Sequence, residues 1–211
     1  MEIYTWLSRY FPNQFRQPQG NLGRLIGWLE SRHNAAANDF ALEHLGVQRG
    51  DWVLEVGCGP GVSLQKLMRQ SVTGRAAGID YSPIMLAQAQ RRNAAAIREA
   101  RLLLSCGDSC RLPFAPAIFN KVLMVSVIYF LPEPERCLRE LARVQKPGGR
   151  IAIYMTSKED LEQEAFVQKG AFRLFTASEG VALLQRAGYR DARYETRTIH
   201  KRTGICLLGE K

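Results

Sequence analysis

The stretch Val53-Leu-Glu-Val-Gly-Cys-Gly-Pro-Gly61 decides the fold, because it joins a short apolar strand to a glycine-rich turn. Trp52–Val56 predicts the strand, and Val62–Gln70, with leucines on one face, predicts a helix after the turn. Glycine adopts backbone angles that other residues avoid, and it places no side chain between the backbone and a ligand. In open α/β sheets, ligands bind at the carboxyl ends of the strands. The stretch therefore predicts a ligand-binding turn at the edge of such a sheet.

Strands and helices alternate along the chain after this turn. Further apolar strands are expected at 76–80, 102–105, 121–127 and 151–154. Helices are expected from Pro83 to about Ala96, with Ser82 as N-cap, and over Pro134–Val144. This order predicts a parallel sheet covered on both faces.

The carboxyl-terminal part has a different pattern. The sequence Thr176-Ala-Ser-Glu179 is a capping box that begins a helix over Val181–Ala187. Tyr189–Ile199 and Gly204–Leu208 predict an antiparallel hairpin. The expected fold is therefore a Rossmann-like, doubly wound α/β sheet of seven strands, mostly parallel and with a carboxyl-terminal antiparallel hairpin.

Residues 1–45 are expected to form a helical, aromatic-rich cap that belongs to the same domain as residues 46–211. The spacing of apolar residues over 21–45 predicts helix, and the segment before it is rich in aromatic side chains. These are Tyr4, Trp6, Tyr10, Phe11 and Phe15. Two roles stay open for them: a lid over the ligand site, or the packing of a helix against the sheet.

Composition indicates one globular domain, with 211 residues of which 46% are hydrophobic and 23% charged. No apolar stretch reaches the roughly 18–20 residues that span a bilayer. The beginning, MEIYTWLSRY, lacks a secretory cleavage site, so we expect a cytoplasmic protein. The net charge of +9 comes from scattered single arginines, which favours a basic soluble surface over an acidic substrate or an RNA partner.

The cysteines give no sign of a metal or redox site. There are five, an odd number, and no two form a C-x-x-C pair. Cys106 and Cys110 have no matching second pair. We therefore expect reduced thiols and no metal ion.

The spacing of the turn separates two classes of ligand. The dinucleotide fingerprint is G-x-G-x-x-G/A, which would place a small residue at position 62. Here position 62 is Val62, and the third glycine comes one place early, at Gly61. An acid, Glu55, also precedes the turn. This arrangement suits a ligand with a cationic amino group better than it suits a pyrophosphate.

The turn resembles motif I of the class I S-adenosylmethionine-dependent methyltransferases. Other segments resemble family motifs in the expected order: Gly78-Ile-Asp-Tyr-Ser82, Gly107-Asp108 with Leu112-Pro113-Phe114, Phe119-Asn-Lys-Val122, Lys146-Pro-Gly-Gly149 and Ala187-Gly188-Tyr189. The sequence departs from the family at Asn120, where aspartate is usual. The resemblance is closest to small-molecule enzymes of methyltransferase type 11, such as those of ubiquinone and menaquinone biosynthesis.

The resemblance implies S-adenosylmethionine as cofactor and assigns it a set of binding residues. The backbone at Gly57, Gly59 and Gly61 would lie against the methionine part, and Glu55 would attract its amino group. Asp80 would accept hydrogen bonds from the ribose hydroxyls, and Asp108 from the adenine amino group. The remaining residues of the implied cofactor site are Cys58, Tyr81, Met85, Gly107, Ser109 and Ser126.

Methyl transfer needs in-line alignment of a nucleophile more than it needs a dedicated base. No catalytic residue is therefore assigned, and Tyr129 and His33 are weak candidates for a base. We expect a small, apolar or aromatic acceptor and a monomer or homodimer. Nucleic acid is disfavoured because the segment Val125-Ser-Val-Ile-Tyr-Phe-Leu-Pro132 lacks the N/D-P-P-Y/F pattern of base methyltransferases. An RNA or protein methyltransferase and a non-catalytic protein that kept the fold remain alternatives.

Overall fold

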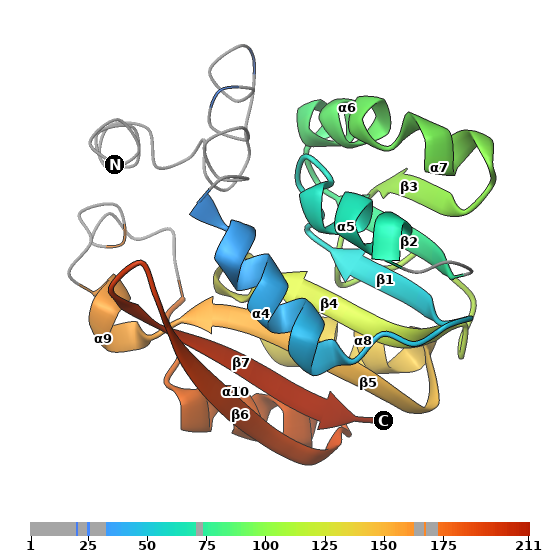
Figure 1. Cartoon of the computed structure of the whole chain (residues 1–211). Coiled ribbons are helices and arrows are strands. Elements are labelled where there is room, and N and C mark those ends of the chain that lie inside the picture. The colour runs from blue at the N-terminus through green and yellow to red at the C-terminus, as the bar shows by residue number, and fades with distance from the viewer. Residues whose placement is uncertain (1–19, 21–24, 26–32, 71–73, 163–166, 168–172) are drawn as a thin grey trace.

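A seven-stranded sheet forms the centre of the computed structural model, which describes residues 20, 25, 33–70, 74–162, 167 and 173–211 (Figure 1). The strand order is β3-β2-β1-β4-β5-β7-β6. Strands β1 to β5 run parallel, and β7 pairs antiparallel with both β5 and β6. The bounds are β1 Trp52–Val56, β2 Arg75–Asp80, β3 Leu102–Cys106, β4 Phe119–Val125, β5 Gln145–Thr156, β6 Arg190–Ile199 and β7 Arg202–Glu210. The predicted doubly wound sheet with its terminal hairpin is confirmed.

The helices begin where the capping signals place them. Ser82 is the N-cap of α6 with Pro83 at its first turn, and the Thr176–Glu179 capping box begins α10. The bounds are α4 Ala35–Leu45, α5 Val62–Gln70, α6 Pro83–Arg92, α7 Ala94–Arg98, α8 Pro134–Val144, α9 Lys158–Leu161 and α10 Ala177–Arg186, with a 3₁₀ turn over Ile128–Phe130. None of the helices in the described ranges has the length and apolar composition needed to cross a bilayer.

Alternating side chains along the strands build two cores, one on each face of the sheet. Leu54 and Met124 pack with α8 and α10, whereas Val53 and Leu123 pack with α4 and α5. Figure 1 shows α4 and α5 in front of the sheet and α8 and α10 behind it. Because successive side chains on a strand point to opposite faces, Glu55 shares its face with Val53. The acid before the turn is therefore buried toward α5.

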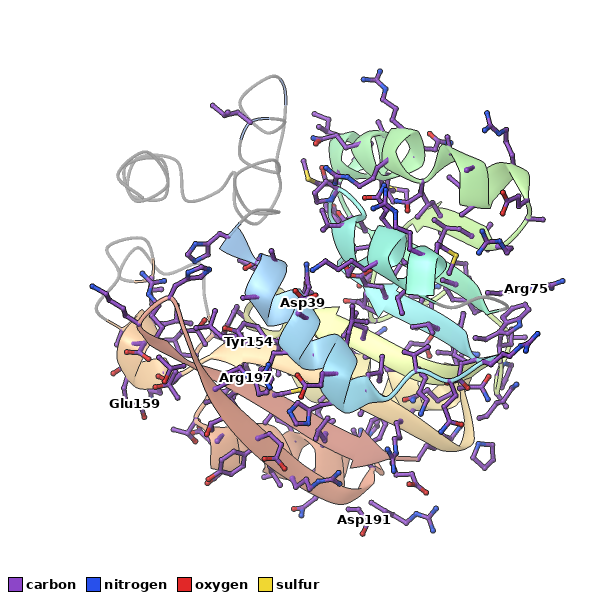
Figure 2. The ribbon with its side chains drawn as sticks, in the orientation of Figure 1. Asp39, Arg75, Tyr154, Glu159, Asp191 and Arg197 are labelled. Atoms are coloured by element: carbon purple, nitrogen blue, oxygen red, sulfur yellow. A yellow bond between two sulfur atoms is a disulfide. The ribbon has the colours of Figure 1, made fainter. Side chains whose placement is uncertain are left out.

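Helix α4 belongs to the same packed body as the sheet. Phe40 is 1% exposed and stacks edge-on against Tyr154 of β5, while the Arg197 guanidinium of β6 lies over its ring. Figure 2 shows Tyr154 and Arg197 beside this helix. Gly46 ends α4 in the left-handed conformation, with φ +61°. The aromatic residues 4, 6, 10, 11 and 15 lie outside the described residues, so their predicted role stays a prediction.

Several boundaries differ from those expected from sequence; among them, α10 begins at Ala177 and β7 extends over Arg202–Glu210. The helix predicted over Pro83–Ala96 divides at Asn93 into α6 and α7. Strand β5 begins at Gln145, and the Pro147-Gly-Gly149 turn is a bulge within it: its register shifts between Phe119 and Lys121 of β4. Strand β4 ends at Val125 because Ser126 has a left-handed backbone, with φ +58°.

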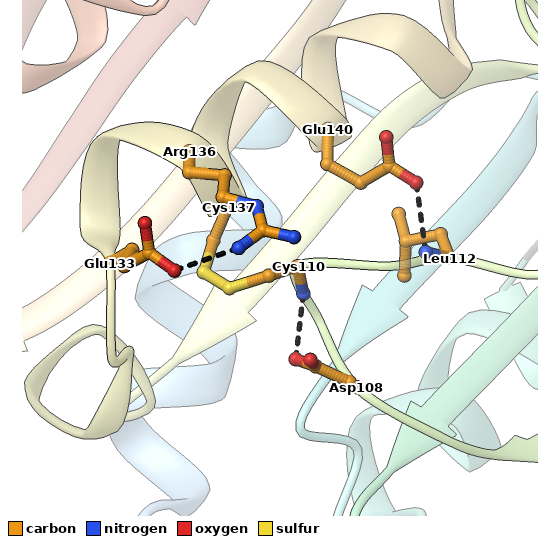
Figure 3. Close-up of a disulfide and its surroundings, with 7 residues drawn as sticks. All are labelled: Asp108, Cys110, Leu112, Glu133, Arg136, Cys137 and Glu140. Carbon is orange, nitrogen blue, oxygen red and sulfur yellow. Dashed lines mark hydrogen bonds and ion pairs between the residues drawn. A yellow bond between two sulfur atoms is a disulfide. The ribbon is translucent and has the colours of Figure 1, made fainter.

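The expectation of reduced thiols is wrong for two of the cysteines. The structure joins Cys110, in the loop after β3, to Cys137 of α8 as a disulfide (Figure 3). Cys58, Cys106 and Cys206 are free, as expected. The partner of Cys110 could not be found from sequence spacing, because the two cysteines are 27 residues apart and meet only when α8 packs on the sheet.

Candidate active site

The glycine turn after β1 is held against β2 by backbone hydrogen bonds. Gly57 N–H and Cys58 N–H both donate to the Ile79 carbonyl, at 2.8 and 3.1 Å. Within the turn, Gly61 N–H donates to the Cys58 carbonyl at 2.9 Å. The turn therefore lies at the carboxyl ends of β1 and β2, the position predicted for it.

The three glycines of the turn are required for two different reasons. All have left-handed φ angles, +68° at Gly57, +50° at Gly59 and +73° at Gly61. A Cβ at Gly57 would lie 2.2 Å from Val127 Cγ2, and one at Gly61 would lie 2.9 Å from Ala89 Cβ. A Cβ built on Gly59 would have no described atom of another residue outside its chain neighbours within 4 Å. Only Gly59 presents bare backbone to open space, while Gly57 and Gly61 make room for protein.

Asp80 joins the end of β2 to this turn. Its Oδ2 accepts a hydrogen bond from Gly59 N–H and its Oδ1 accepts one from Ser82 N–H, both at 2.8 Å. Burial raises the pKa of the Asp80 carboxyl, and the backbone hydrogen bonds from Ser82 and Gly59 oppose the rise. Both oxygens keep further lone pairs, so Asp80 can hold the turn and still accept from a ligand.

Glu55 is a buried acid with one oxygen that lacks a partner. It is 2% exposed; Ser63 of α5 donates its hydroxyl hydrogen bond to Oε1, and Oε2 has no hydrogen-bond partner among the described residues. Burial raises the pKa of the Glu55 carboxyl from 4.5 to about 8, against the Ser63 bond and with the help of the Asp80 charge. A buried acceptor without a partner is costly, and a cationic donor would satisfy it.

The loop after β3 carries the next predicted residues. Gly107 N–H donates to the Asp80 carbonyl at 3.1 Å, which brings this loop beside the end of β2. The exposed Asp108 accepts from Cys110 N–H through Oδ1 at 2.8 Å, and Ser109 is half-buried. Tyr81 is 64% exposed, whereas Met85 is buried at 2% in the underside of α6. Asp108 and Tyr81 are therefore accessible to a ligand in this structure, and Met85 is packed away.

The segment after β4 packs against the glycine turn on the side opposite β2. Ser126 N–H donates to the Tyr154 carbonyl at 3.0 Å, and the positive φ of Ser126 is unusual for a residue with a side chain. It turns the chain so that Val127 lies against Gly57. Cys58 is buried, with its Sγ 3.0 Å from the position of a Cβ at Gly78. Cys58 therefore fills space beneath the turn, and its burial raises the pKa of its thiol.

The two weak candidates for a base, Tyr129 and His33, contact other parts of the protein. The Tyr129 hydroxyl accepts from Thr156 N–H at 2.5 Å, and burial raises the pKa of its phenol. His33 stacks on His200 with ring centroids 5.1 Å apart, and burial lowers the pKa of its imidazole to about 4. The contacts of Tyr129 favour a structural role, and neither Tyr129 nor His33 is proposed as a base.

Sequence reasoning missed three residues that shape the site. Ser63 bonds Glu55, Arg92 donates to the Pro60 carbonyl, and Asn93 donates to the Gly61 carbonyl. A hydroxyl in the first turn of α5 was the only local signal for Ser63. Nothing in the sequence marks Arg92 or Asn93, because the end of α6 meets the turn only in the folded chain.

Comparisons with known proteins agree with this geometry. A methyltransferase domain model matches residues 54–153. YdaC, an uncharacterized methyltransferase of Bacillus subtilis, is 27% identical over 188 residues, which are 89% of this chain and 98% of YdaC. A demethylmenaquinone methyltransferase of Tropheryma whipplei is 34% identical over 67% of this chain and 55% of its own length.

The matched domain and these relatives support a class I S-adenosylmethionine-dependent methyltransferase. A solved structure agrees in fold: phosphoethanolamine N-methyltransferase 2 of Haemonchus contortus, in complex with phosphomonomethylethanolamine and S-adenosylhomocysteine. Its TM-score is 0.71 at 18% identity, over 83% of this chain and 52% of that one. The methyltransferase spans nearly all of YdaC but 40%, 51% and 55% of three other curated relatives.

The residues present fit S-adenosylmethionine, the cofactor of this methyltransferase family. The open backbone at Gly59 leaves room for a ligand, and Asp80 retains acceptor capacity beside it. The buried Glu55 Oε2 that lacks a partner suits the cofactor's ammonium group. A bound cation would satisfy this acceptor, for which the described residues provide no hydrogen-bond donor.

Gly57→Ala and Gly59→Ala separate packing from ligand access in the methyltransferase. Gly57→Ala should lower the free energy of unfolding by about 2–5 kcal/mol, since it combines left-handed strain with overpacking against Val127. Gly59→Ala should lower it by about 1–2 kcal/mol through strain alone. Urea denaturation measures both changes, and Gly57→Ala with Val127→Ala should recover part of the loss. Equal losses in the two single variants would contradict the assignment.

Glu55→Gln should change how the stability of the cofactor-free methyltransferase depends on pH. Because the folded pKa of Glu55 lies near 8 and its ordinary value is 4.5, its stabilising contribution is complete below about pH 4.5 and is lost as pH rises toward 8. The wild type should therefore lose stability relative to Glu55→Gln by at most about 1.4 kcal/mol per pH unit over that range. Denaturation at pH 5 to 8 measures this difference.

The exposed acid Glu159 of α9 supplies the matched control. Glu159→Gln should leave the pH dependence of stability close to that of the wild type, because the Glu159 side chain lies exposed at the surface. Parallel curves for wild type and Glu55→Gln would show that Glu55 is ionised in the folded protein at neutral pH.

Proposed function

We propose that this methyltransferase methylates a small, apolar or aromatic acceptor that binds over the segment after β4. The observation that carries the proposal is the character of residues 125–131, which follow the strand beside the glycine turn. Ile128 and Leu131 are buried, Val127 and Phe130 are partly buried, and the segment contains no charged side chain. Such a wall favours apolar surface over a charged or strongly polar acceptor.

The relatives support a small acceptor. The Tropheryma whipplei relative is named for demethylmenaquinone, and the Haemonchus contortus structure contains phosphomonomethylethanolamine. These names describe small molecules of different polarity, so they do not choose between apolar and polar acceptors. The apolar segment after β4 favours an apolar acceptor.

In the proposed mechanism, bound S-adenosylmethionine supplies an electrophilic methyl group on its sulfonium. Glu55 would accept from the cofactor's ammonium group, Asp80 would accept from the ribose hydroxyls, and Asp108 would accept from the adenine amino group. Gly59 allows close approach of the backbone, and Val127 with its apolar neighbours excludes water from the acceptor. Alignment of this kind can supply up to roughly 7–11 kcal/mol of barrier lowering, so no base is required of the chain.

Labelled methyl transfer tests the class of acceptor. The protein is incubated with S-adenosylmethionine that carries a labelled methyl group, together with a cell extract, and the label is followed into solvent-extractable small molecules, RNA and protein. Label is expected in an extractable apolar compound. Label in RNA or protein would contradict the proposed acceptor but not methyl transfer, and no transfer to any fraction would favour a non-catalytic protein.

Asp80→Asn tests the assignment of the ribose carboxylate. It should weaken binding of S-adenosylhomocysteine by about 10- to 150-fold, because one charged hydrogen-bonding group contributes about 1.5–3 kcal/mol. Asp191→Asn, an exposed acid on β6 with a left-handed backbone that asparagine also adopts, is the matched control (Figure 2). Isothermal titration calorimetry gives both dissociation constants. An unchanged constant in Asp80→Asn would remove Asp80 from the cofactor site.

A further inference from the structure

The glycine turn is intrinsically loose and needs to be held from both sides. Glycine loses more conformational freedom on folding than any other residue, and three of the five residues from 57 to 61 are glycine. On one side, β2 holds the turn through the Ile79 carbonyl and the Asp80 carboxylate. These contacts fix Gly57, Cys58 and Gly59, but they leave the carbonyls of Pro60 and Gly61 to other partners.

The end of helix α6 supplies a side-chain partner for each, and the Gly61 carbonyl also accepts from Gln65 N–H at 3.1 Å. Asn93 is 4% exposed, and its Nδ2 donates to the Gly61 carbonyl and to the Ala89 carbonyl, both at 3.0 Å. Arg92 Nη1 donates to the Pro60 carbonyl at 2.5 Å. Gln65 of α5 donates to the Arg92 carbonyl at 3.3 Å, which ties α6 to the helix that follows the turn. Both carbonyls are therefore held by side chains that come from 32 residues further along the chain.

Helix α6 connects the two halves of the cofactor site. It begins immediately after Asp80, with Ser82 as its N-cap, and ends at Arg92 and Asn93 on the turn. Ala89 packs so closely against Gly61 that a Cβ built on Gly61 would lie 2.9 Å from Ala89 Cβ. The same rigid element is thus fixed at one end to the proposed ribose carboxylate and at the other to the glycine turn.

We propose that Arg92 and Asn93 are positioning residues that fix the glycine turn in the shape that binds the cofactor. They act through the carbonyls of Pro60 and Gly61, and they do not themselves contact the cofactor. Without them the peptide groups that follow Pro60 and Gly61 lose these side-chain donors, and the Gly59 N–H loses its alignment with Asp80. The inference rests on the proposed role of the turn as the cofactor site.

The positioning role is tested with Arg92→Met and Asn93→Ala, with Arg91→Met as the matched control. Arg91 precedes Arg92 on the same helix and is exposed. Arg92→Met and Asn93→Ala should each weaken binding of S-adenosylhomocysteine about tenfold, the scale of one hydrogen bond's contribution, and Arg91→Met should not. Arg92→Lys, which keeps one donor and the charge, should restore most of the affinity. Calorimetry at a temperature well below each variant's Tm measures these constants.

A second measurement separates this inference from the proposed cofactor site. Amide hydrogen exchange of Gly59 and Gly61 in the cofactor-free protein should be faster in Arg92→Met and Asn93→Ala than in wild type and Arg91→Met. Faster exchange with weaker binding supports the inference. A lower Tm with unchanged amide exchange and unchanged affinity for S-adenosylhomocysteine would show that both residues only stabilise the fold, and would overturn the inference. If wild type itself fails to bind S-adenosylhomocysteine, the cofactor site is wrong, and exchange alone decides whether the end of α6 holds the turn.

Discussion

The hydrogen bond from Gly59 N–H to the Asp80 carboxylate is the contact on which the site depends. It joins the turn after β1 to the end of β2, across 21 residues of sequence, at 2.8 Å. Because Asp80 also accepts from Ser82 at the start of α6, one partly buried carboxylate sets the positions of the turn and the helix together. The acid proposed to hold the ribose therefore also shapes the surface against which the rest of the cofactor would lie.

Much of the fold was predictable because its signals are local. The strands are apolar runs of the right length, and Ser82 with Pro83 and Thr176 with Glu179 mark helix starts within four residues. What was missed depends on contacts between distant segments. The division of a helix at Asn93 follows from its bond to Gly61, and the Cys110–Cys137 disulfide follows from the packing of α8. No window of sequence contains both partners of either contact.

The glycines show the same limit inside the site. In sequence the three are equivalent, and all were predicted to admit the cofactor. In the structure Val127 occupies the space at Gly57 and Ala89 that at Gly61, which leaves only Gly59 open. The departure at Asn120 is explained in the same way. Its Oδ1 accepts from Trp52 N–H at 3.1 Å and from Lys146 at 3.3 Å, so an amide oxygen holds the start of β1 without a negative charge.

Two acids would let the proposed site select its ligand by charge. Asp80 ends β2 and Glu55 is the last residue but one of the neighbouring β1, and the charge of Asp80 adds to the burial that raises the pKa of Glu55. A dinucleotide would bring a pyrophosphate toward these carboxylates, where like charges in a medium of low dielectric repel strongly. A ligand with an ammonium group instead satisfies the Glu55 oxygen that lacks a partner and favours its ionised form. The strand–turn–helix architecture is shared by both ligand classes, so the position of the acids, more than the number of glycines, distinguishes them.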